Sequence, residues 1–440
     1  MKPPSFRCIP TRREFLGLSA RAALAYPALN FAFAMVSCGG GSSAPPPPPP
    51  VSDDEFLDQI QRAIFQFFWE QASPTTGQVK DHALAAGTDT RTISSIAATG
   101  FGLTGLCIGH KRGYGDGAQI KARVATTLDF LLNQLTHVNG FFYHFIDMNT
   151  GARASNGEVS PIDTSILLCG VLTCRQYFQD AQIQSLATQI YNRVNWPWML
   201  NGGAAFSLGW TPESGFIPSR WDTYSELMMI YLLAIGSPTN PVPASSWDAF
   251  TRPIFTFQGI TYITNLNAPL FIHQFSHAWF DFRNKSDKYA NYFDNSVKAT
   301  QAHKLFCLSL RGQWKDYQSN LWGLSASDSV NGYAVWGGPP SMGPIDGSIV
   351  PYAAAGSIPF VPGDCLTVLR NIRTQYPKAW QRYGFVDAFN PLSGWYDPDV
   401  IGIDVGISML MAENYRSSFV WDTFMTNPEA HGAFQAVLLR

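Results

Sequence analysis

The chain has 440 residues, with 30 Lys and Arg against 32 Asp and Glu, so its formal net charge is −2. A near-neutral chain without a basic stripe does not have the composition of a nucleic-acid-binding protein, and 14% aromatic residues are too many for a disordered chain. The charged fraction, also 14%, is below the roughly 25% of typical soluble domains. These numbers indicate a large globular protein with much buried surface.

Residues 1–38 have the pattern of an export signal. Arg12 and Arg13 precede an Ala-rich apolar stretch over 22–36, which resembles a bacterial Tat signal. The segment ends at Cys38, which resembles the lipidated cysteine of a lipobox; an ordinary cleaved signal with an incidental cysteine is the alternative. The stretch is too short for a spanning helix of ~20 residues. We therefore expect a location in the bacterial cell envelope, with membrane contact only through a lipid anchor.

Residues 39–52 are predicted to be a linker, because Gly and Ser lead into six consecutive prolines that cannot form a core. The remaining cysteines have no metal-ligand spacing and are interpreted as small buried hydrophobes, with one disulfide left open. These cysteines are Cys107, Cys169, Cys174, Cys307 and Cys365.

Residues 53–440 are predicted to be one mostly helical domain, because apolar residues recur at helical spacing and strand patterns are few. Long loops rich in Gly, Pro and Trp span 196–221 and 312–362, and such loops commonly carry function. The predicted helices cover 53–71, 92–110, 117–136, 161–179, 181–194, 222–235, 274–282, 286–309, 364–375, 404–418 and 427–439.

Acidic residues among Gly and aromatic residues are the candidate catalytic groups. Glu158 and Asp163 lie in a loop that enters an apolar helix; Asp163 or Ser160 alternatively caps that helix, whereas Glu158 has no such role. Glu213 follows Pro212 in a loop with Gly and aromatic residues. We expect this apolar setting to raise the pKa of the Glu213 carboxyl and to favour its acid form.

Further acids lie on or beside apolar helices. Glu226 is predicted to lie on a helix capped by Asp222, where it joins a structural network or contacts a ligand. Asp404 lies at a loop-to-helix junction flanked by glycines, either as a functional acid or as an N-cap. Glu413, on the same helix, is predicted to be structural.

Histidine and tryptophan side chains add candidate binding groups. His273 and His277 are four residues apart, but the intervening sequence is not His-Glu-x-x-His and no third ligand is placed by spacing. We therefore predict hydrogen-bonding histidines and no metal site. Trp210 and Trp322 flank Gly-rich loops, where each ring either stacks on a sugar or packs in the core.

The sequence has no Gly-x-Ser-x-Gly elbow, no P-loop and no Rossmann fingerprint after a strand. The sequence therefore does not favour serine-hydrolase chemistry or a nucleotide cofactor. Two carboxyl groups that flank a glycosidic bond remain the most economical mechanism.

Five motifs in order resemble the glucoamylase-like domain of glycoside hydrolase family 144 and of cyclic beta-1,2-glucan synthases. The resemblance covers residues 53–435 and implies an all-α fold, an (α/α)6 barrel of six helical hairpins, with long loops at one end forming the cleft. It also implies an inverting hydrolysis of beta-1,2-glucan, endo-acting or sophorose-releasing, without a metal requirement. We separately expect a monomer without a cofactor. The motifs are Glu158–Thr164, Leu208–Phe216, His273–His277, Trp322–Asp328 and Gly402–Arg416.

Under this resemblance we expect Glu213 to be the general acid and Asp404 the general base. The resemblance keeps two alternatives open, namely a hydrolase of another glucan and a non-catalytic glycan-binding lipoprotein. The expected contacts to the glucan substrate come from Glu158, Asp163, Glu226, Trp210, His273, His277 and Trp322.

Overall fold

The computed structural model describes residues 51–265, 269–338 and 345–439. The predicted signal segment, Cys38 and residues 39–50 of the linker lie outside the described residues. A search of the described helices found none with the length and apolar character needed to cross a membrane.

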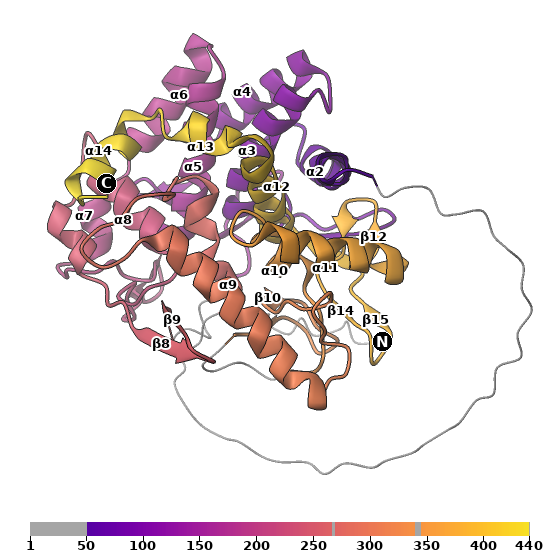
Figure 1. The fold of residues 1–440 in the computed structure, drawn as a ribbon. Helices are drawn as coiled ribbons and strands as arrows, with labels where there is room; N and C mark the ends of the chain where they lie inside the picture. Colours follow the sequence, from indigo (N-terminus) through magenta and orange to yellow (C-terminus); the bar gives the residue numbers. More distant parts are fainter. Residues whose placement is uncertain (1–50, 266–268, 339–344, 440) are drawn as a thin grey trace, which may run out of the picture.

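An inner ring of helices forms the centre of the molecule. The four longer α-helices of this ring are buried on nearly all sides, as expected of helices that are apolar all round. α3 packs against α5 and α12, and α5 also packs against α8 (Figure 1). The inner α-helices are α3 (Ile96–Arg112), α5 (Pro161–Tyr177), α8 (Met228–Ile235), α12 (Gly402–Ser417) and the short α10 (Pro351–Ala355). Two 3₁₀ turns, η2 (Leu270–His273) and η3 (Phe275–Ala278), occupy the remaining position in the inner ring.

Amphipathic helices surround this ring, each with one buried and one exposed face. They are α2 (Asp53–Glu70), α4 (Gly117–Asn133), α6 (Ala181–Asn192), α9 (Tyr292–Ser309) and α11 (Pro362–Gln375). Shorter elements close the gaps between them, namely α7 (Trp196–Leu200), α13 (Phe419–Phe424), α14 (Pro428–Ala436), η1 (Ala244–Asp248), η4 (Leu310–Gly312) and η5 (Pro377–Ala379). Because inner and outer segments alternate along the chain, the protein is an (α/α)6 barrel.

The inner helices begin at the same end of the barrel. The backbone N–H of Ile96, at the start of α3, donates to His144 O (3.2 Å), and Ser160 N, just before α5, donates to Phe142 O (3.0 Å). Gly402 N, at the start of α12, donates to Asp81 O (2.8 Å). The loops before these helices are therefore joined to one another.

Short antiparallel ladders, each of two strands, stiffen the loops in the described part of the chain. Two of them join distant segments at the end where the inner helices begin: β1 (His82–Leu84) pairs with β16 (Asp399–Ile401), and β2 (Ile93–Ser95) with β5 (Phe145–Asp147). The other pairs are β3 (His137–Val138) with β4 (Phe141–Phe142), β6 (Trp210–Thr211) with β7 (Gly215–Phe216), β8 (Ile254–Phe257) with β9 (Ile260–Ile263), β10 (Ala326–Ser327) with β11 (Ala334–Val335), β12 (Trp380–Gln381) with β13 (Gly384–Phe385), and β14 (Phe389–Asn390) with β15 (Trp395–Tyr396).

The predicted helices agree with the structure wherever their apolar spacing is regular. The predicted α-helix over 274–282 is wrong, because this segment forms only the short 3₁₀ turn η3, directly after η2. The helix predicted from 222 starts only at Met228, so Asp222 is not its cap. The backbone O of Asp222 instead accepts from Thr251 N (2.7 Å), which holds the preceding residues in a loop.

Candidate active site

The loop before α5 carries a compact group of two acids and a histidine. His144 Nδ1 lies 3.5 Å from Glu158 Oε1 and 3.7 Å from Asp163 Oδ2, and both acids are at least nine-tenths buried. Ser160 is the N-cap of α5, since its Oγ accepts from Asp163 N (3.1 Å). The capping role that was open between Ser160 and Asp163 therefore belongs to Ser160.

Trp210 and Glu213 lie on the β6–β7 hairpin, which is joined to the same loop. Val159 N donates to Trp210 O (2.7 Å), and Trp210 N donates back to Val159 O (3.0 Å). The Trp210 ring is half-buried beside Trp198, with ring centroids 5.9 Å apart. One ring edge or face is thus left for a ligand at this end of the barrel.

Glu213 lies at the tip of this hairpin, and its side chain is 61% exposed. Both carboxylate oxygens accept from Arg153, at 2.6 and 3.1 Å. This hydrogen-bonded guanidinium lowers the pKa of Glu213. The prediction that an apolar setting raises the pKa of Glu213 is therefore wrong, because the hairpin turns the Glu213 side chain outward toward Arg153.

Glu226 is buried two residues before α8 begins. Ser276 Oγ donates to its backbone O (2.8 Å) and accepts from Met229 N (3.2 Å), which fixes the start of α8 against η3. The prediction that Glu226 lies on the helix is wrong, because α8 begins two residues later. Its carboxyl group remains at the end of the barrel where the other acids lie.

His273, His277 and Trp322 are at most 2% exposed. His273 contacts Tyr224 Oη (3.2 Å) and Thr264 Oγ1 (3.3 Å), and His277 contacts Ser296 Oγ (3.1 Å). Burial lowers the pKa of both histidines to about 3, so both rings are neutral. All three side chains are buried in this structure, and the expected contact of each with a sugar stays a prediction.

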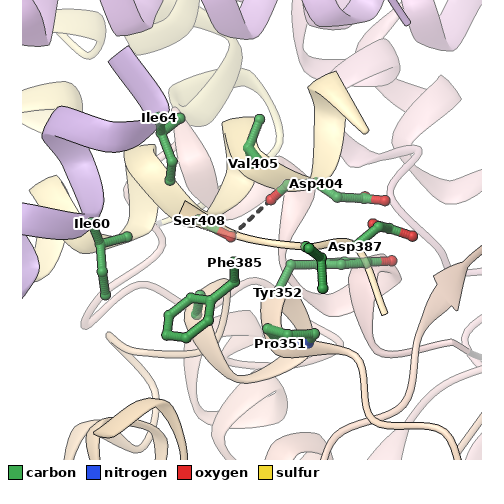
Figure 2. A pocket seen from close by; sticks show the side chains of 11 residues that line it. Ile60, Ile64, Pro351, Tyr352, Phe385, Asp387, Asp404, Val405 and Ser408 are labelled. Atoms are coloured by element: carbon green, nitrogen blue, oxygen red, sulfur yellow. Dashed lines mark hydrogen bonds between the residues drawn. The ribbon is translucent and has the colours of Figure 1, made fainter. Parts of the chain in front are cut away.

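Asp404 lies in the first turn of α12 and is 2% exposed. It lines a small cavity together with Asp387 and Tyr352. Figure 2 shows the carboxyl groups of Asp404 and Asp387 and the hydroxyl end of Tyr352 pointing to the same side. The Tyr352 hydroxyl donates to Ala326 O (2.6 Å), which fixes the Tyr352 side chain in the wall of the cavity.

Asp387 connects Asp404 to further acids. Asp387 Oδ2 accepts from Asp328 N (2.8 Å), whereas Asp387 Oδ1 is buried and has no hydrogen-bond partner among the described residues. Asp397 Oδ1 accepts from Asp399 N (3.0 Å), and Asp397 Oδ2 also has no such partner in the described part of the chain. Negative charge is therefore concentrated beside Asp404.

Few cations balance this acidic cluster. Arg91 donates to both oxygens of Asp399, each at 2.6 Å. His82 Nδ1 lies 2.6 Å from Asp81 Oδ2, and His82 Nε2 lies 3.5 Å from Asp328 Oδ2. Burial alone would lower the pKa of His82, but the two aspartates outweigh it and raise that pKa well above its ordinary value.

The acids in the cluster respond to burial and to one another. Burial, followed by the charges of Asp404, Asp397 and Asp328, raises the pKa of Asp387 well above its ordinary value. Burial and the charge of Asp328 raise the pKa of Asp397 to about 7. Both directions follow from the cost of placing like charges together in a poorly solvated site.

Two triads have ligand atoms close enough to hold one cation: His144 with Glu158 and Asp163, and Asp328 with Asp397 and Asp399. In each triad these atoms lie within 4.8 Å of one another. In the second triad, however, Arg91 already occupies both oxygens of Asp399.

Sequence reasoning missed Asp387, Asp397 and His82 as members of this site. Asp397 precedes Pro398, and both Asp and Pro are common in turns, so the local sequence does not separate a functional aspartate from a turn residue. Asp387 is 17 positions from Asp404 in the chain, and only the β-ladders and α12 bring the two together.

The fold and site define a class of protein: an (α/α)6 barrel with exposed and buried carboxyl groups at the end where the inner helices begin. The family model described as "Putative glucoamylase" matches residues 218–428. Residues 218–428 are thus similar to a glucoamylase-like domain. The matched range includes Glu226, Asp387 and Asp404 but not Glu158, Asp163 or Glu213.

Known relatives cover nearly the whole described chain. An exo beta-1,2-glucooligosaccharide sophorohydrolase (non-reducing end) from Parabacteroides distasonis is 26% identical over 96% of this chain, which spans about 63% of that relative's length. An endo-beta-1,2-glucanase from Chitinophaga pinensis, solved with sophorotriose and glucose, is 27% identical with a TM-score of 0.80, over 89% of this chain and 99% of that one. A beta-1,2-glucanase structure from P. distasonis gives 26% identity and a TM-score of 0.83, over 88% of this chain and 60% of that one.

Proposed function

We propose that this protein is a glycoside hydrolase that cleaves beta-1,2-linked glucan. The single observation that carries the proposal is the match, over nearly nine-tenths of the chain, to a beta-1,2-glucan hydrolase whose own chain is covered almost completely. The carboxyl groups and the half-buried Trp210 at one end of the barrel supply the acid, base and stacking surface that such a reaction needs.

Asp404 is the general base of this proposal, and Glu213 is the general acid. Asp404 lies beside a cavity and in a first helical turn, where the helix dipole favours the ionised form that accepts a proton from water. The Glu213 side chain is 61% exposed on the hairpin that carries Trp210, so it is open to a glycosidic oxygen. To act as an acid, Glu213 must separate from Arg153 and take up a proton when glucan binds.

In an inverting reaction, Glu213 protonates the leaving oxygen while Asp404 removes a proton from the attacking water on the other side of the sugar. The water oxygen bonds to the anomeric carbon as the glycosidic bond breaks, and the product has the inverted configuration. Glu158, Asp163 and Glu226 bind sugar hydroxyl groups, and these three residues are also the reserve candidates for the acid.

The substrate is tested by incubating the purified protein with linear beta-1,2-glucan, starch and beta-1,3-glucan. New reducing ends and their anomeric form are followed by proton NMR. We expect release from beta-1,2-glucan only, with inverted anomers, and the product lengths separate endo action from sophorose release. Tight glycan binding without release from any glucan would instead indicate a binding lipoprotein.

The site is tested with Asp404→Asn, Glu213→Gln and Glu158→Gln, with Asp294→Asn on the exposed first turn of α9 as the control. Loss of a general acid or base lowers kcat by about 10²- to 10⁴-fold. We expect this loss for Asp404→Asn and Glu213→Gln, with glucan affinity retained. Full activity of Glu213→Gln together with an inactive Glu158→Gln would transfer the acid role to Glu158.

The same proposal places the protein in the bacterial cell envelope, exported by its twin-arginine segment and anchored through Cys38. The Ala-rich stretch, the small residue before Cys38 and the proline-rich linker after it support this placement. Metabolic labelling with an alkyne fatty acid should mark the wild-type protein and not Cys38→Ser. Equal labelling of both would contradict the lipid anchor.

A further inference from the structure

The cavity that Asp404 lines holds a second carboxyl group that the proposed reaction does not use. Asp387 is 5% exposed and lies in the segment between β13 and β14. Its carboxyl group lines the same cavity as Asp404 and points to the same side (Figure 2). Two carboxyl groups that share one poorly solvated cavity cannot both be ionised at low cost.

The hydrogen bonds of Asp387 leave one of its oxygens unsatisfied. Oδ2 accepts from Asp328 N at 2.8 Å, and Oδ1 is buried without a hydrogen-bond partner among the described residues. A buried, unsatisfied oxygen that carries negative charge is costly, whereas a protonated carboxyl group bears no net charge. Because Asp404 Oδ2 is also buried, the geometry favours one neutral carboxyl group in this cavity.

Charged groups around Asp387 favour the same state. Asp404 faces it from α12, Asp328 from the end of β10, and Asp397 from the segment between β15 and β16. The cations of the cluster lie on other members, because Arg91 is bonded to Asp399, and His82 pairs with Asp81 and Asp328. Burial and the neighbouring aspartates accordingly raise the pKa of Asp387.

The helix decides which of the two carboxyl groups is ionised. Asp404 is in the first turn of α12, where the unpaired backbone N–H groups and the helix dipole stabilise a negative charge. Asp387 lies on no helix. A single proton shared between the two therefore resides on Asp387.

We infer that Asp387 and Asp404 hold one proton between them, and that neutral Asp387 is a positioning residue that keeps Asp404 ionised as the base. This inference rests on the proposed function for its catalytic consequence, but the proton sharing itself is a property of the folded protein. It can therefore be tested without substrate.

The first test is the pH dependence of unfolding for wild type, Asp387→Asn and the control Asp294→Asn. An aspartate whose pKa is higher in the folded state than in the unfolded state destabilises the fold as the pH rises above its unfolded value, about 4. We expect the urea midpoint of Asp387→Asn to exceed that of wild type at pH 8, and the difference to shrink steadily toward pH 4. A difference that is the same at every pH would overturn the inference.

A reciprocal variant covers the case in which Asp387→Asn does not fold. In Asp404→Asn, the neighbouring negative charge is absent and Asp387 ionises more easily. The loss of stability between pH 4 and pH 8 should then be smaller than in wild type. An unchanged loss would show that the two groups do not share a proton.

The second test is the pH profile of kcat/KM for Asp387→Asn on beta-1,2-glucan. An amide mimics the protonated carboxyl group, so the acid limb of the Asp387→Asn profile should stay at the wild-type pH whatever the change in kcat. If Asp387 were ionised in the active enzyme, its removal would shift the acid limb down by about one pH unit or more, and the inference would fail. If wild type cleaves no glucan, the unfolding test still decides the proton sharing.

Discussion

Asp404 and Glu213 differ in how the structure prepares them for chemistry. Asp404 is held at a helix start beside a cavity, whereas Glu213 is exposed and paired with Arg153. Under the proposed function, Asp404 is therefore already in place as the base in the unliganded protein, and Glu213 acts as the acid only when Arg153 is displaced. The two residues accordingly make different predictions about pH.

The pairing of Glu213 with Arg153 predicts a shift in the alkaline limb of activity. The arginine lowers the pKa of Glu213 by stabilising its anion, so Arg153→Gln should raise that pKa. A general acid works in its protonated form, and the alkaline limb of kcat/KM should therefore move to higher pH by about one unit. Profiles of the two proteins on beta-1,2-glucan provide the measurement. An alkaline limb that does not move would indicate that Glu213 is not the acid.

Helices α3 and α5 approach so closely that two glycines face each other. A Cβ atom on Gly170 would lie 2.1 Å from Gly100 O, and one on Gly100 would lie 2.5 Å from Ile166 O. These are backbone contacts, which a side-chain rotation cannot relieve. Because α5 carries the Glu158 loop and α3 contacts α12, this interface sets the spacing of the acids.

Gly170→Ala should therefore lower the free energy of unfolding by about 2–3 kcal/mol, since an added methyl group forces the backbones apart. Gly432→Ala is the matched control, because Gly432 lies on helix α14 and a Cβ there meets no atom within 4 Å. That control should stabilise the protein by up to about 1 kcal/mol through helix propensity. Urea unfolding measures both. Equal stability of Gly170→Ala and wild type would contradict the close α3–α5 contact.

At the scale of the whole molecule, the described cysteines are all buried and free. The closest pair, Cys107 and Cys174, has sulfur atoms 3.6 Å apart, which is too long for a disulfide bond of about 2.05 Å. The disulfide that the sequence left open is therefore absent among the described residues. Burial raises the pKa of Cys307 to about 12, and it raises the pKa of Cys107, Cys169 and Cys365 well above the ordinary value.

Thiol labelling should consequently report global unfolding. Ellman's reagent needs a thiolate and access to it, so the five described cysteines should not react in native buffer and should all react in concentrated urea. The double variant Cys8→Ser/Cys38→Ser controls for the two thiols outside the described residues. Rapid labelling of any of the five in native buffer would contradict the burial of the cysteines.

The sequence alone determined the helical nature of this protein, because apolar spacing is a local property of each segment. It also predicted the structural role of Glu413. Glu413 is fully buried, and its Oε2 accepts from Gln61 Nε2 and Arg112 Nε, each at 3.0 Å. The prediction of an (α/α)6 barrel came from the motif resemblance, because many helical arrangements satisfy the same apolar spacing.

Only the tertiary structure decided which acids meet. Asp387 joins Asp404 because β1 pairs with β16 and Asp387 N donates to Asp399 O (3.1 Å), contacts that no local pattern encodes. Tertiary packing also buried His273 and His277, which the sequence placed in a ligand site, and turned Glu213 outward to Arg153. The physical reason is the same in each case: the burial and charge of a side chain depend on distant segments that the fold brings against it, whereas helix formation depends on near neighbours.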